Sequence, residues 1–408
     1  MTANKTGNPP SLRSRGAPRL ETALLVVGVA ALGYNLRGAI TSLPPLFPEL
    51  AGRLGLSAVS LSVLAATPVL CFGAVSGFAA WFSRRLGEER VLLLAAFTLM
   101  AGLLLRAAAP RAALFPGTIA ASAAIAVMNV LLSSLIKRRW PERAGLLVGV
   151  YITALSLGAI VGSLAAVPLW NATGGSVPLA LGWLAAPAAL AAAVWLPQFR
   201  YRTDHGASPV LRGLPVFRHA LAWQVTLFMG TQSLLYYATL SWLPSILRDR
   251  GVSPEGAGNL LALMGVGNLA VSLIVPVLAH RMRSQHALVV PTVLALAVGL
   301  AGAVYAPLGS APAWVLILGA GQNAALSLAI YFTMARAPHP AAAASLSSLA
   351  QAVGYLLASA GPLEVGLLHS ATGSWNPPLA VLFALNAMLM AAGVLAARAR
   401  VLPDGART

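Results

Sequence analysis

Residues 48–57 read PELAGRLGLS, and residues 244–253 read PSILRDRGVS. In both stretches a proline is followed seven residues later by glycine, an aliphatic residue and serine, so the second stretch repeats the first at an offset of 196 residues. An offset close to half of the 408-residue chain indicates two related halves.

Other residues follow nearly the same offset. The pairs are Arg85 with Arg281, Gly158 with Gly354 and, with a slip of two residues, Asn129 with Asn323. Four matches in the same order predict two parallel repeats packed around a site near the middle of the membrane.

The composition indicates where such repeats reside. The chain is 58% hydrophobic and 9% charged, whereas soluble domains contain about 25% charged residues. This excludes a soluble enzyme or a nucleic-acid-binding protein. With about 20 residues for each span, we predict an all-α integral membrane protein with twelve transmembrane helices in two six-helix repeats. The apolar segments are 20–48, 57–83, 90–109, 112–136, 144–170, 176–197, 218–247, 255–280, 287–307, 311–335, 341–370 and 376–400.

The positive charge, +17 overall, is concentrated in alternate loops. Short cytoplasmic loops are rich in Lys and Arg, which predicts a multi-pass protein of a bacterial cytoplasmic (inner) membrane with both termini in the cytoplasm. The clusters assigned to that side are Lys5/Arg13/Arg15/Arg19, Arg84/Arg85/Arg90, Lys137/Arg138/Arg139/Arg143, Arg200/Arg202/Arg212/Arg218, Arg281/Arg283, Arg336 and Arg398/Arg400/Arg407.

Polar stretches divide the chain further. We predict a cytoplasmic N-terminal segment 1–19, an N-terminal six-helix bundle 20–197, a cytoplasmic linker 198–217, a C-terminal six-helix bundle 218–400 and a cytoplasmic tail 401–408. The linker contains Gly and Pro residues that are typical of irregular structure. The single cysteine, Cys71, cannot form an intrachain disulfide.

One cation lies within an apolar helix. An arginine at the bilayer centre costs at least about 2.5–3.5 kcal/mol, so Arg37 is a candidate for the substrate site. Its planar fork of donors suits a planar monovalent anion or a nitro or carboxylate group. The alternative is that its side chain extends to the membrane surface.

Neutral polar residues occur at helical spacing in other apolar segments. Those we expect to contact the substrate with Arg37 are Tyr34, Asn35, Asn129, Gln232, Tyr236, Asn323, Gln351 and Tyr355. Isolated polar groups in an apolar medium are costly, so they face either a cavity or one another. The alternative role is hydrogen bonding between packed helices.

Glu364 and His369 are candidates for proton coupling or an outer gate. Desolvation favours a protonated carboxyl, which suits a proton carrier. However, Glu364 lies nine residues after Tyr355, on the opposite side of an ideal helix. Pairing with a neighbouring helix and contact with lipid headgroups are the alternatives.

Several motifs resemble one family. They are Asn35-Leu36-Arg37, Thr67-Pro68-Val69-Leu70-Cys71-Phe72-Gly73, Gly354-Tyr355-Leu356-Leu357-Ala358 with Gly361-Pro362, and Leu368-His369 followed by Thr372-Gly373-Ser374-Trp375. The whole chain resembles the major facilitator superfamily and, within it, the cyanate permease and 2-nitroimidazole transporter family. The resemblance implies alternating access and a small planar solute such as cyanate or a nitroimidazole-like ring.

The chain departs from these patterns in two places. The superfamily has Asp-Arg-x-Gly after its second helix, whereas Arg84-Arg85-Leu86-Gly87 stands here without the acidic residue. The family often has an acidic residue directly after the histidine that corresponds to His369 in the apolar segment 341–370, and here Ser370 follows.

We therefore expect a secondary active transporter of a small planar solute, with protons as candidate co-transported or exchanged ions. A proton-coupled exporter of apolar drugs is the alternative, because Gly149, Gly158 and Gly162 have the spacing of such antiporters, although Ser163 replaces the motif's proline. A non-transporting membrane sensor is the second alternative. We expect a monomer in the lipid bilayer with no enzymatic activity, cofactor, metal site or nucleic-acid partner.

Overall fold

The structure is a computed structural model that describes residues 19–200, 216–272, 274–282 and 284–403. The described residues form helices and no strands, so the predicted all-α membrane fold is confirmed. The predicted N-terminal segment up to residue 18, residues 201–215 of the predicted linker and residues 404–408 of the predicted tail lie outside the described residues.

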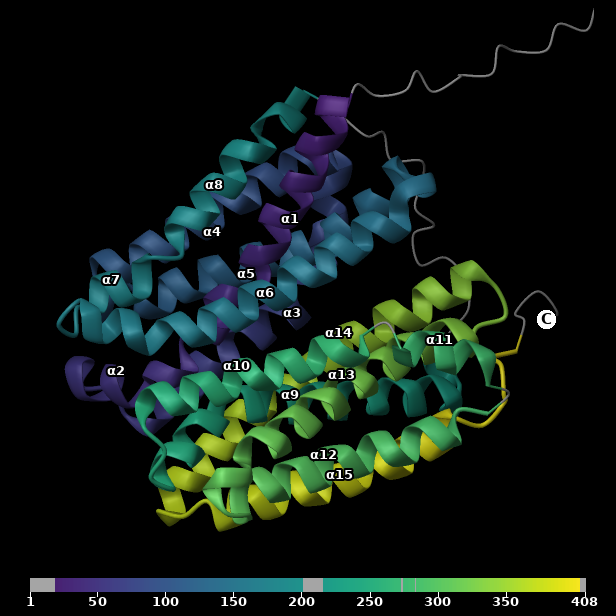
Figure 1. Cartoon of the computed structure of the whole chain (residues 1–408). Helices are drawn as coiled ribbons and strands as arrows, with labels where there is room; N and C mark the ends of the chain where they lie inside the picture. The colour runs from purple at the N-terminus through teal and green to yellow at the C-terminus, as the bar shows by residue number, and fades with distance from the viewer. Residues whose placement is uncertain (1–18, 201–215, 273, 283, 404–408) are drawn as a thin grey trace, which may run out of the picture.

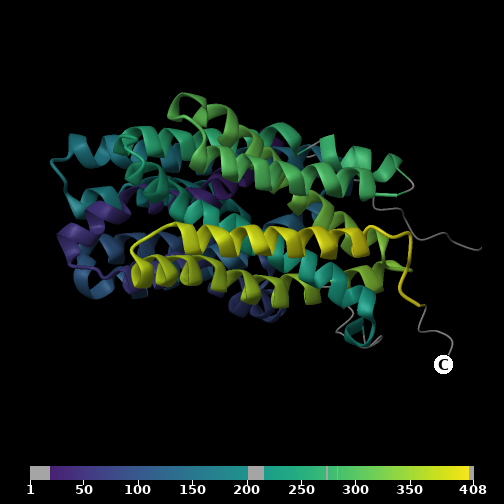
Figure 2. The same cartoon turned by 90° about the horizontal axis from the view of Figure 1, so that it is seen from below.

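The helices form two bundles (Figure 1). The first contains α1 (Arg19–Thr41), α2 (Phe47–Leu54), α3 (Ala58–Leu86), α4 (Glu88–Ala108), α5 (Pro110–Arg139), α6 (Ala144–Ala172), α7 (Val177–Gly182) and α8 (Ala185–Trp195). The second contains α9 (Ala220–Asp249), α10 (Pro254–Val271), α11 (Ile274–Arg281), α12 (His286–Tyr305), α13 (Ala311–Ala335), α14 (Pro340–Thr372) and α15 (Asn376–Ala396). The long helices of both bundles run along roughly one direction (Figure 2).

The first predicted span is interrupted. Helix α1 ends at Thr41, and the short 3₁₀ helix Pro44–Leu46 leads into α2. Pro44 and Pro45 lack the backbone N–H that an α-helix needs, and a residue before proline avoids the helical conformation. The chain therefore turns here and continues as α2 at one end of the bundle.

The predicted spans 176–197 and 255–280 are also interrupted, between α7 and α8 and between α10 and α11. Pro187 and Pro276 each lie shortly after the break. A proline removes the hydrogen bond to the carbonyl four residues earlier and crowds that carbonyl. Both interruptions therefore follow from the sequence.

Eleven spans in the described residues are long and apolar enough to cross a membrane. The twelfth long helix, α9, has 30 residues but a more polar sequence. Every residue from Gly230 to Pro244 is buried, because neighbouring helices surround α9. Its polar side chains therefore face protein or cavity rather than lipid.

The two halves share local structure at the predicted repeat offset. Ser57 caps α3 by accepting a hydrogen bond from Ser60 N at 3.1 Å, and Ser253 caps α10 by accepting one from Gly256 N at 3.1 Å. The preceding turns use glycine with positive φ in each half. These features give the two quoted stretches the same role at the start of equivalent helices.

Equivalent helix crossings occur in both halves. On α6, Gly158 lies against the backbone of Tyr34 on α1, and on α14, Gly354 lies against the backbone of Gly230 on α9. Both contacting pairs are related by 196 residues. Glycine permits this close approach because a β-carbon would collide with the facing backbone.

Across the junction of the bundles, α3 packs on α14 and α6 packs on α10. Helices α1 and α9 lie on the inner side of their bundles, where a side chain from one bundle can reach the other. We refer to the end of the molecule with α2 and the α9–α10 turn as the α2 end. The bundles lie close together there and diverge toward the opposite end (Figure 1).

Candidate functional site

The side chain of Arg37 joins the two bundles. It extends from α1, is partly buried, and donates a hydrogen bond from Nη1 to the hydroxyl of Tyr236 on α9 at 2.7 Å. Its Cζ lies 5.0 Å from the centroid of the Tyr236 ring. Arg37 therefore points between the bundles rather than toward lipid, and two residues predicted for the site contact each other.

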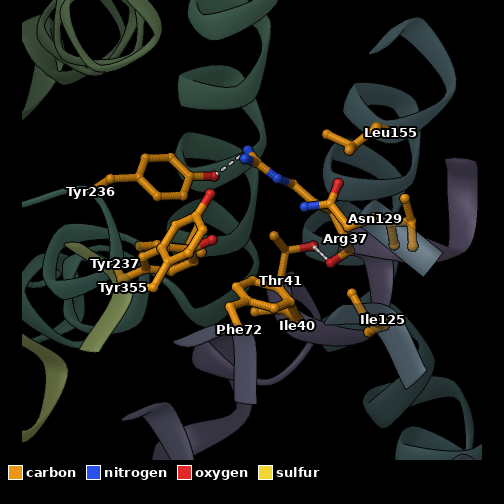
Figure 3. Close-up of a pocket in the computed structure, with 12 residues that line it drawn as sticks. Arg37, Ile40, Thr41, Phe72, Ile125, Asn129, Leu155, Tyr236, Tyr237 and Tyr355 are labelled. Atoms are coloured by element: carbon orange, nitrogen blue, oxygen red, sulfur yellow. Dashed lines mark hydrogen bonds between the residues drawn. The ribbon is translucent and has the colours of Figure 1, made fainter. Parts of the chain in front are cut away.

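A cavity lies beside this pair (Figure 3). The centre of a water-sized sphere can occupy about 40 Å³ inside it. By the same measure, a cavity for one water needs about 10–15 Å³. This cavity can therefore hold a solute of only a few non-hydrogen atoms without rearrangement. Its lining comes from both bundles: Leu36, Arg37, Ile40, Thr41, Phe72, Ile125, Asn129, Leu155, Tyr236, Tyr237, Leu240 and Tyr355.

Aromatic rings form one wall of the cavity. The ring of Phe72 lies 5.8 Å from that of Tyr355 and 6.2 Å from that of Tyr237, while Tyr236 and Tyr237 are 5.0 Å apart, all as centroid distances. These tilted and edge-to-face arrangements are favourable for aromatic pairs. The wall therefore combines flat apolar surfaces with hydroxyl groups.

Hydrogen-bond donors converge on the cavity. The hydroxyls of Tyr236, Tyr237 and Tyr355 are directed toward the side where Arg37 and Asn129 lie (Figure 3). Those of Tyr237 and Tyr355 have no hydrogen-bond partner among the described residues. A guanidinium has five N–H donors, and one hydrogen bond to protein uses only part of this capacity.

The electrostatics of the site favour an anion. No Asp or Glu is among the described residues that line the cavity, and Arg37 forms no ion pair with a described residue. An unpaired cation in a confined environment of low dielectric constant attracts negative charge more strongly than it would in water. The cavity thus provides a positive site with several hydrogen-bond donors.

A second, smaller cavity adjoins the first and shares Arg37 and Tyr236 with it. It offers about 20 Å³ to water-sized molecules and is lined in addition by Ser156 on α6 and Asn268 on α10. Thr41 and Leu240 also line both cavities, so the hydrogen-bonded pair of Arg37 and Tyr236 borders both spaces.

Several predicted site residues lie outside both cavities. The amide of Asn35 donates to the carbonyls of Ala31 at 2.8 Å and Pro187 at 3.1 Å, and so joins α1 to α8. Tyr34 is partly buried on α1 and lines neither cavity.

Three predicted amides also bond elsewhere. Gln232 is buried and donates to the hydroxyl of Ser233 at 2.6 Å. Asn323 donates to the carbonyl of Asn268 at 2.5 Å and joins α13 to α10. Gln351 is exposed and donates to Ser347 at 2.8 Å, within α14. Gln232 and Asn323 therefore have the contacts of packing residues, whereas Gln351 contacts only a residue of its own helix.

Glu364 and His369 also line neither cavity. Glu364 is exposed on α14 and lines neither space. The ring of His369 stacks on Trp375 at 3.7 Å with an interplanar angle of 7°. The indole of Trp375 donates to Asp249 at 2.7 Å, which places His369 in a contact network at the α2 end.

Charged contacts between the bundles occur at the α2 end. Arg248 Nη1 on α9 donates to both carboxylate oxygens of Glu49 on α2, at 2.7 and 2.9 Å. Asn171 at the end of α6 donates to Glu255 on α10. These interactions hold the two halves together on this side of the cavity.

Tyr237 and Phe72 line the cavity but were not among the site residues predicted from the sequence. Tyr237 directly follows Tyr236, which was predicted for the site. Successive residues of a helix point about 100° apart, so the sequence did not indicate that both side chains would line one cavity. Phe72 looked like an ordinary apolar residue of a membrane helix. A signal was present in its position within the Thr67–Gly73 stretch that carries the family resemblance.

Comparison with known proteins identifies the family of the chain and agrees with its fold. The sequence pattern of the Major Facilitator Superfamily matches residues 23–362. The chain is 35% identical over 377 residues to the 2-nitroimidazole transporter of Escherichia coli (strain K12), covering 92% of this chain and 95% of that protein. It is 27% identical over 353 residues to the cyanate transport protein CynX of the same strain, covering 86% and 91%. The fold matches the crystal structure of a D-xylose–proton symporter with a TM-score of 0.71 at 15% identity, covering 94% and 99% of the chains.

Proposed function

From the premise that the chain belongs to the major facilitator superfamily, we propose that it is a secondary active transporter of a small planar solute, most favourably a monovalent anion. The observation that carries this proposal is the position of Arg37 at the cavity between the bundles, with no acidic residue among the described lining. A cyanate-like anion fits the small cavity as it stands, whereas a polarised ring of the nitroimidazole type presents similar acceptor atoms but requires the cavity to enlarge.

The names of two relatives support the same solute class. One is a 2-nitroimidazole transporter and the other a cyanate transport protein. A cyanate ion, a nitrate ion and a nitro group each present several acceptor atoms in a plane or a line. The donors around Arg37 can satisfy such atoms from more than one direction.

The contacts at the α2 end support an alternating-access cycle. We propose that both termini lie in the cytoplasm, that the protein resides in a bacterial cytoplasmic membrane, and that the α2 end faces outward. The ion pair between Glu49 and Arg248 then closes the outer side. Binding of the anion would compete with Tyr236 for Arg37 and thereby loosen one contact between the bundles.

A thermal-shift panel with purified full-length protein tests the proposal. Cyanate, nitrate, acetate and 2-nitroimidazole are titrated against wild type, Arg37→Ala and the control Arg53→Ala, whose side chain is exposed on α2. We expect the planar anions to raise the unfolding temperature of wild type and of the control, and this shift to disappear in Arg37→Ala. A shift that survives in Arg37→Ala would overturn the assignment of Arg37.

Uptake into proteoliposomes then measures transport of the ligand that binds. Glu364→Gln serves as a second comparison, because the drug-exporter alternative requires that carboxyl. Since Glu364 lies outside both cavities, we expect the variant to transport the planar solute at a rate within about twofold of wild type. Loss of transport in this variant alone would favour the exporter.

A further inference from the structure

The amide of Asn129 faces the cavity from α5, and its orientation decides what it offers a solute. One side of an asparagine amide is an acceptor oxygen and the other is an NH₂ donor. The hydroxyl of Tyr151 on α6 donates to Oδ1 of Asn129. The oxygen is therefore engaged, and the NH₂ group lies on the side that faces Tyr237 and Tyr355 (Figure 3).

Tyr151 is held firmly in this position without lining the cavity. It is 8% exposed and packs on Gly33 of α1. A β-carbon at position 33 would lie 3.1 Å from the carbonyl oxygen of Tyr151 and 3.3 Å from its ring. Because α1 and α6 approach so closely here, the buried Tyr151 packs against α1, and its hydroxyl is directed at Asn129.

We propose that Tyr151 is a positioning residue that determines specificity: by holding Asn129 as a donor, it makes the site select small planar anions of the carboxylate, nitrate or cyanate type over neutral amides of the same shape. The inference rests on the proposed function of the cavity around Arg37 and names the substrate class more narrowly.

The other polar groups of the lining determine how the orientation of the Asn129 amide affects solute selection. Arg37 donates only, and the free hydroxyls of Tyr237 and Tyr355 can also donate. With the NH₂ of Asn129, the cavity then satisfies a solute that carries acceptors on every polar atom. The tyrosine hydroxyls can also accept, but Arg37 and the NH₂ of Asn129 cannot, so an N–H group of a neutral amide that meets either of these two donors stays unpaired, which is a penalty against the wrong solute.

Acetate and acetamide provide a matched pair of probes. They have the same size and planar shape, but acetamide replaces one acceptor oxygen with a donor NH₂ and is neutral. Apparent affinities of both are measured by thermal-shift titration of purified full-length protein. The variants are Tyr151→Phe, which retains the ring, Asn129→Leu, the double variant and Arg37→Ala. Tyr305→Phe is the control, because this tyrosine is 60% exposed on α12.

In Tyr151→Phe the amide can rotate and present its oxygen. We expect acetate to bind about three- to tenfold more weakly, which corresponds to one neutral hydrogen bond, and acetamide to bind as well as or better than in wild type. Asn129→Leu should weaken acetate without any gain for acetamide. In that background Tyr151→Phe should have no further effect, because the two residues act through one contact. Tyr305→Phe should match wild type.

The outcomes distinguish a failure of the positioning role of Tyr151 from a failure of the proposed function. If Arg37→Ala abolishes acetate binding but Tyr151→Phe leaves the acetate-to-acetamide ratio unchanged, the positioning role is wrong and the proposed function stands. If wild type binds no planar anion, or Arg37→Ala binds acetate normally, the proposed function fails and the inference fails with it. Should Tyr151→Phe not fold, a gain of acetamide binding or an unchanged acetate affinity in Asn129→Leu would overturn the inference.

Discussion

At the scale of single residues, a polar side chain can bind a solute only if other protein groups do not already use all of its hydrogen-bond donors and acceptors. Arg37 donates one hydrogen bond through Nη1, to Tyr236, and faces a cavity, whereas the amide of Asn35 donates to two backbone carbonyls within the protein. The two residues are two positions apart on α1. Their roles separate because successive helical residues point in different directions.

Arg37→Lys tests whether the planar fork matters beyond its charge. Lysine keeps a positive charge but presents a compact ammonium that cannot form the same parallel hydrogen bonds. We expect nitrate to bind about tenfold more weakly, the value of one charge-assisted hydrogen bond of about 1.5 kcal/mol. Thermal-shift titration measures this, with Arg53→Lys as the matched control. An affinity equal to wild type would mean that charge alone recognises the solute.

Asn35→Leu should affect stability rather than binding. The substitution leaves the carbonyl of Pro187 without its partner at the contact between α1 and α8. We expect a loss of about 1–3 kcal/mol of stability, typical of an unsatisfied buried group, seen as a lower unfolding temperature. Nitrate affinity should remain within about twofold of wild type, since Asn35 lines neither cavity. If the variant folds but no longer binds nitrate, Asn35 contributes to the substrate-binding site after all.

At the scale of helices, close crossings place the site residues. Gly158 brings α6 against the backbone of α1 one turn before Arg37, and its equivalent Gly354 brings α14 against α9 next to Tyr355. The spacing of α1 from α6 and of α9 from α14 therefore depends on the absence of two side chains. These glycines fit the packing explanation of the motif rather than requiring a drug-export function.

Gly158→Ala should be strongly destabilising, while Gly149→Ala on the same helix should not. A β-carbon at position 158 would collide with the backbone of Tyr34, whereas no atom lies within 4 Å of a β-carbon at position 149. Overpacking costs about 1–3 kcal/mol or more, and alanine at an open helical position gains about 0.5–1 kcal/mol over glycine. Folded yield and unfolding temperature of the two purified variants provide the measurement. Equal stability would show that α1 and α6 can separate at little cost.

The helices and the repeat could be predicted from the sequence, because apolar length and proline, glycine and serine signals are local. The cavity could be predicted only in part. Arg37, Asn129, Tyr236 and Tyr355 were found because polar groups are costly in apolar helices. Gln232 is also a polar residue in an apolar helix, but its amide bonds to Ser233 and does not line the cavity. Helical periodicity shows which residues share a face, but it does not show whether that face meets a cavity or another helix.

At the scale of the whole molecule, the proposed alternating-access cycle requires the two bundles to change their relative positions around Arg37. The contacts at the α2 end oppose this movement on one side. Helices α3 and α14 and helices α6 and α10 form the surfaces along which the bundles meet. The bundles are internally joined by equivalent contacts in each half: Arg139 bonds to Glu89 at 3.1 Å, and Arg336 bonds to Gln285 at 2.5 Å. These two contacts join helices within each half at equivalent positions.

The ion pair between Glu49 and Arg248 should set the balance between states closed and open at the α2 end. The pair is partly buried, with side chains 14% and 20% exposed, so we assign it about 1 kcal/mol, which changes a population ratio about fivefold. In Glu49→Arg two cations face each other across the bundles, and the closed state should lose population. Arg248→Glu should do the same, and the double swap should restore it.

Pulsed electron–electron double resonance measures the populations of the states closed and open at the α2 end directly. Spin labels at Arg53→Cys on α2 and Asn259→Cys on α10, both exposed positions, report the separation of the bundles in a Cys71→Ser background. We expect each single reversal to add a longer-distance population and the double swap to return the wild-type distribution. Unchanged distances in both single variants would show that packing between the helices, rather than this ion pair, holds the α2 end closed. A change that the double swap does not reverse would show that each residue acts through contacts other than their pairing, such as the one from Arg248 to the carbonyl of Pro45.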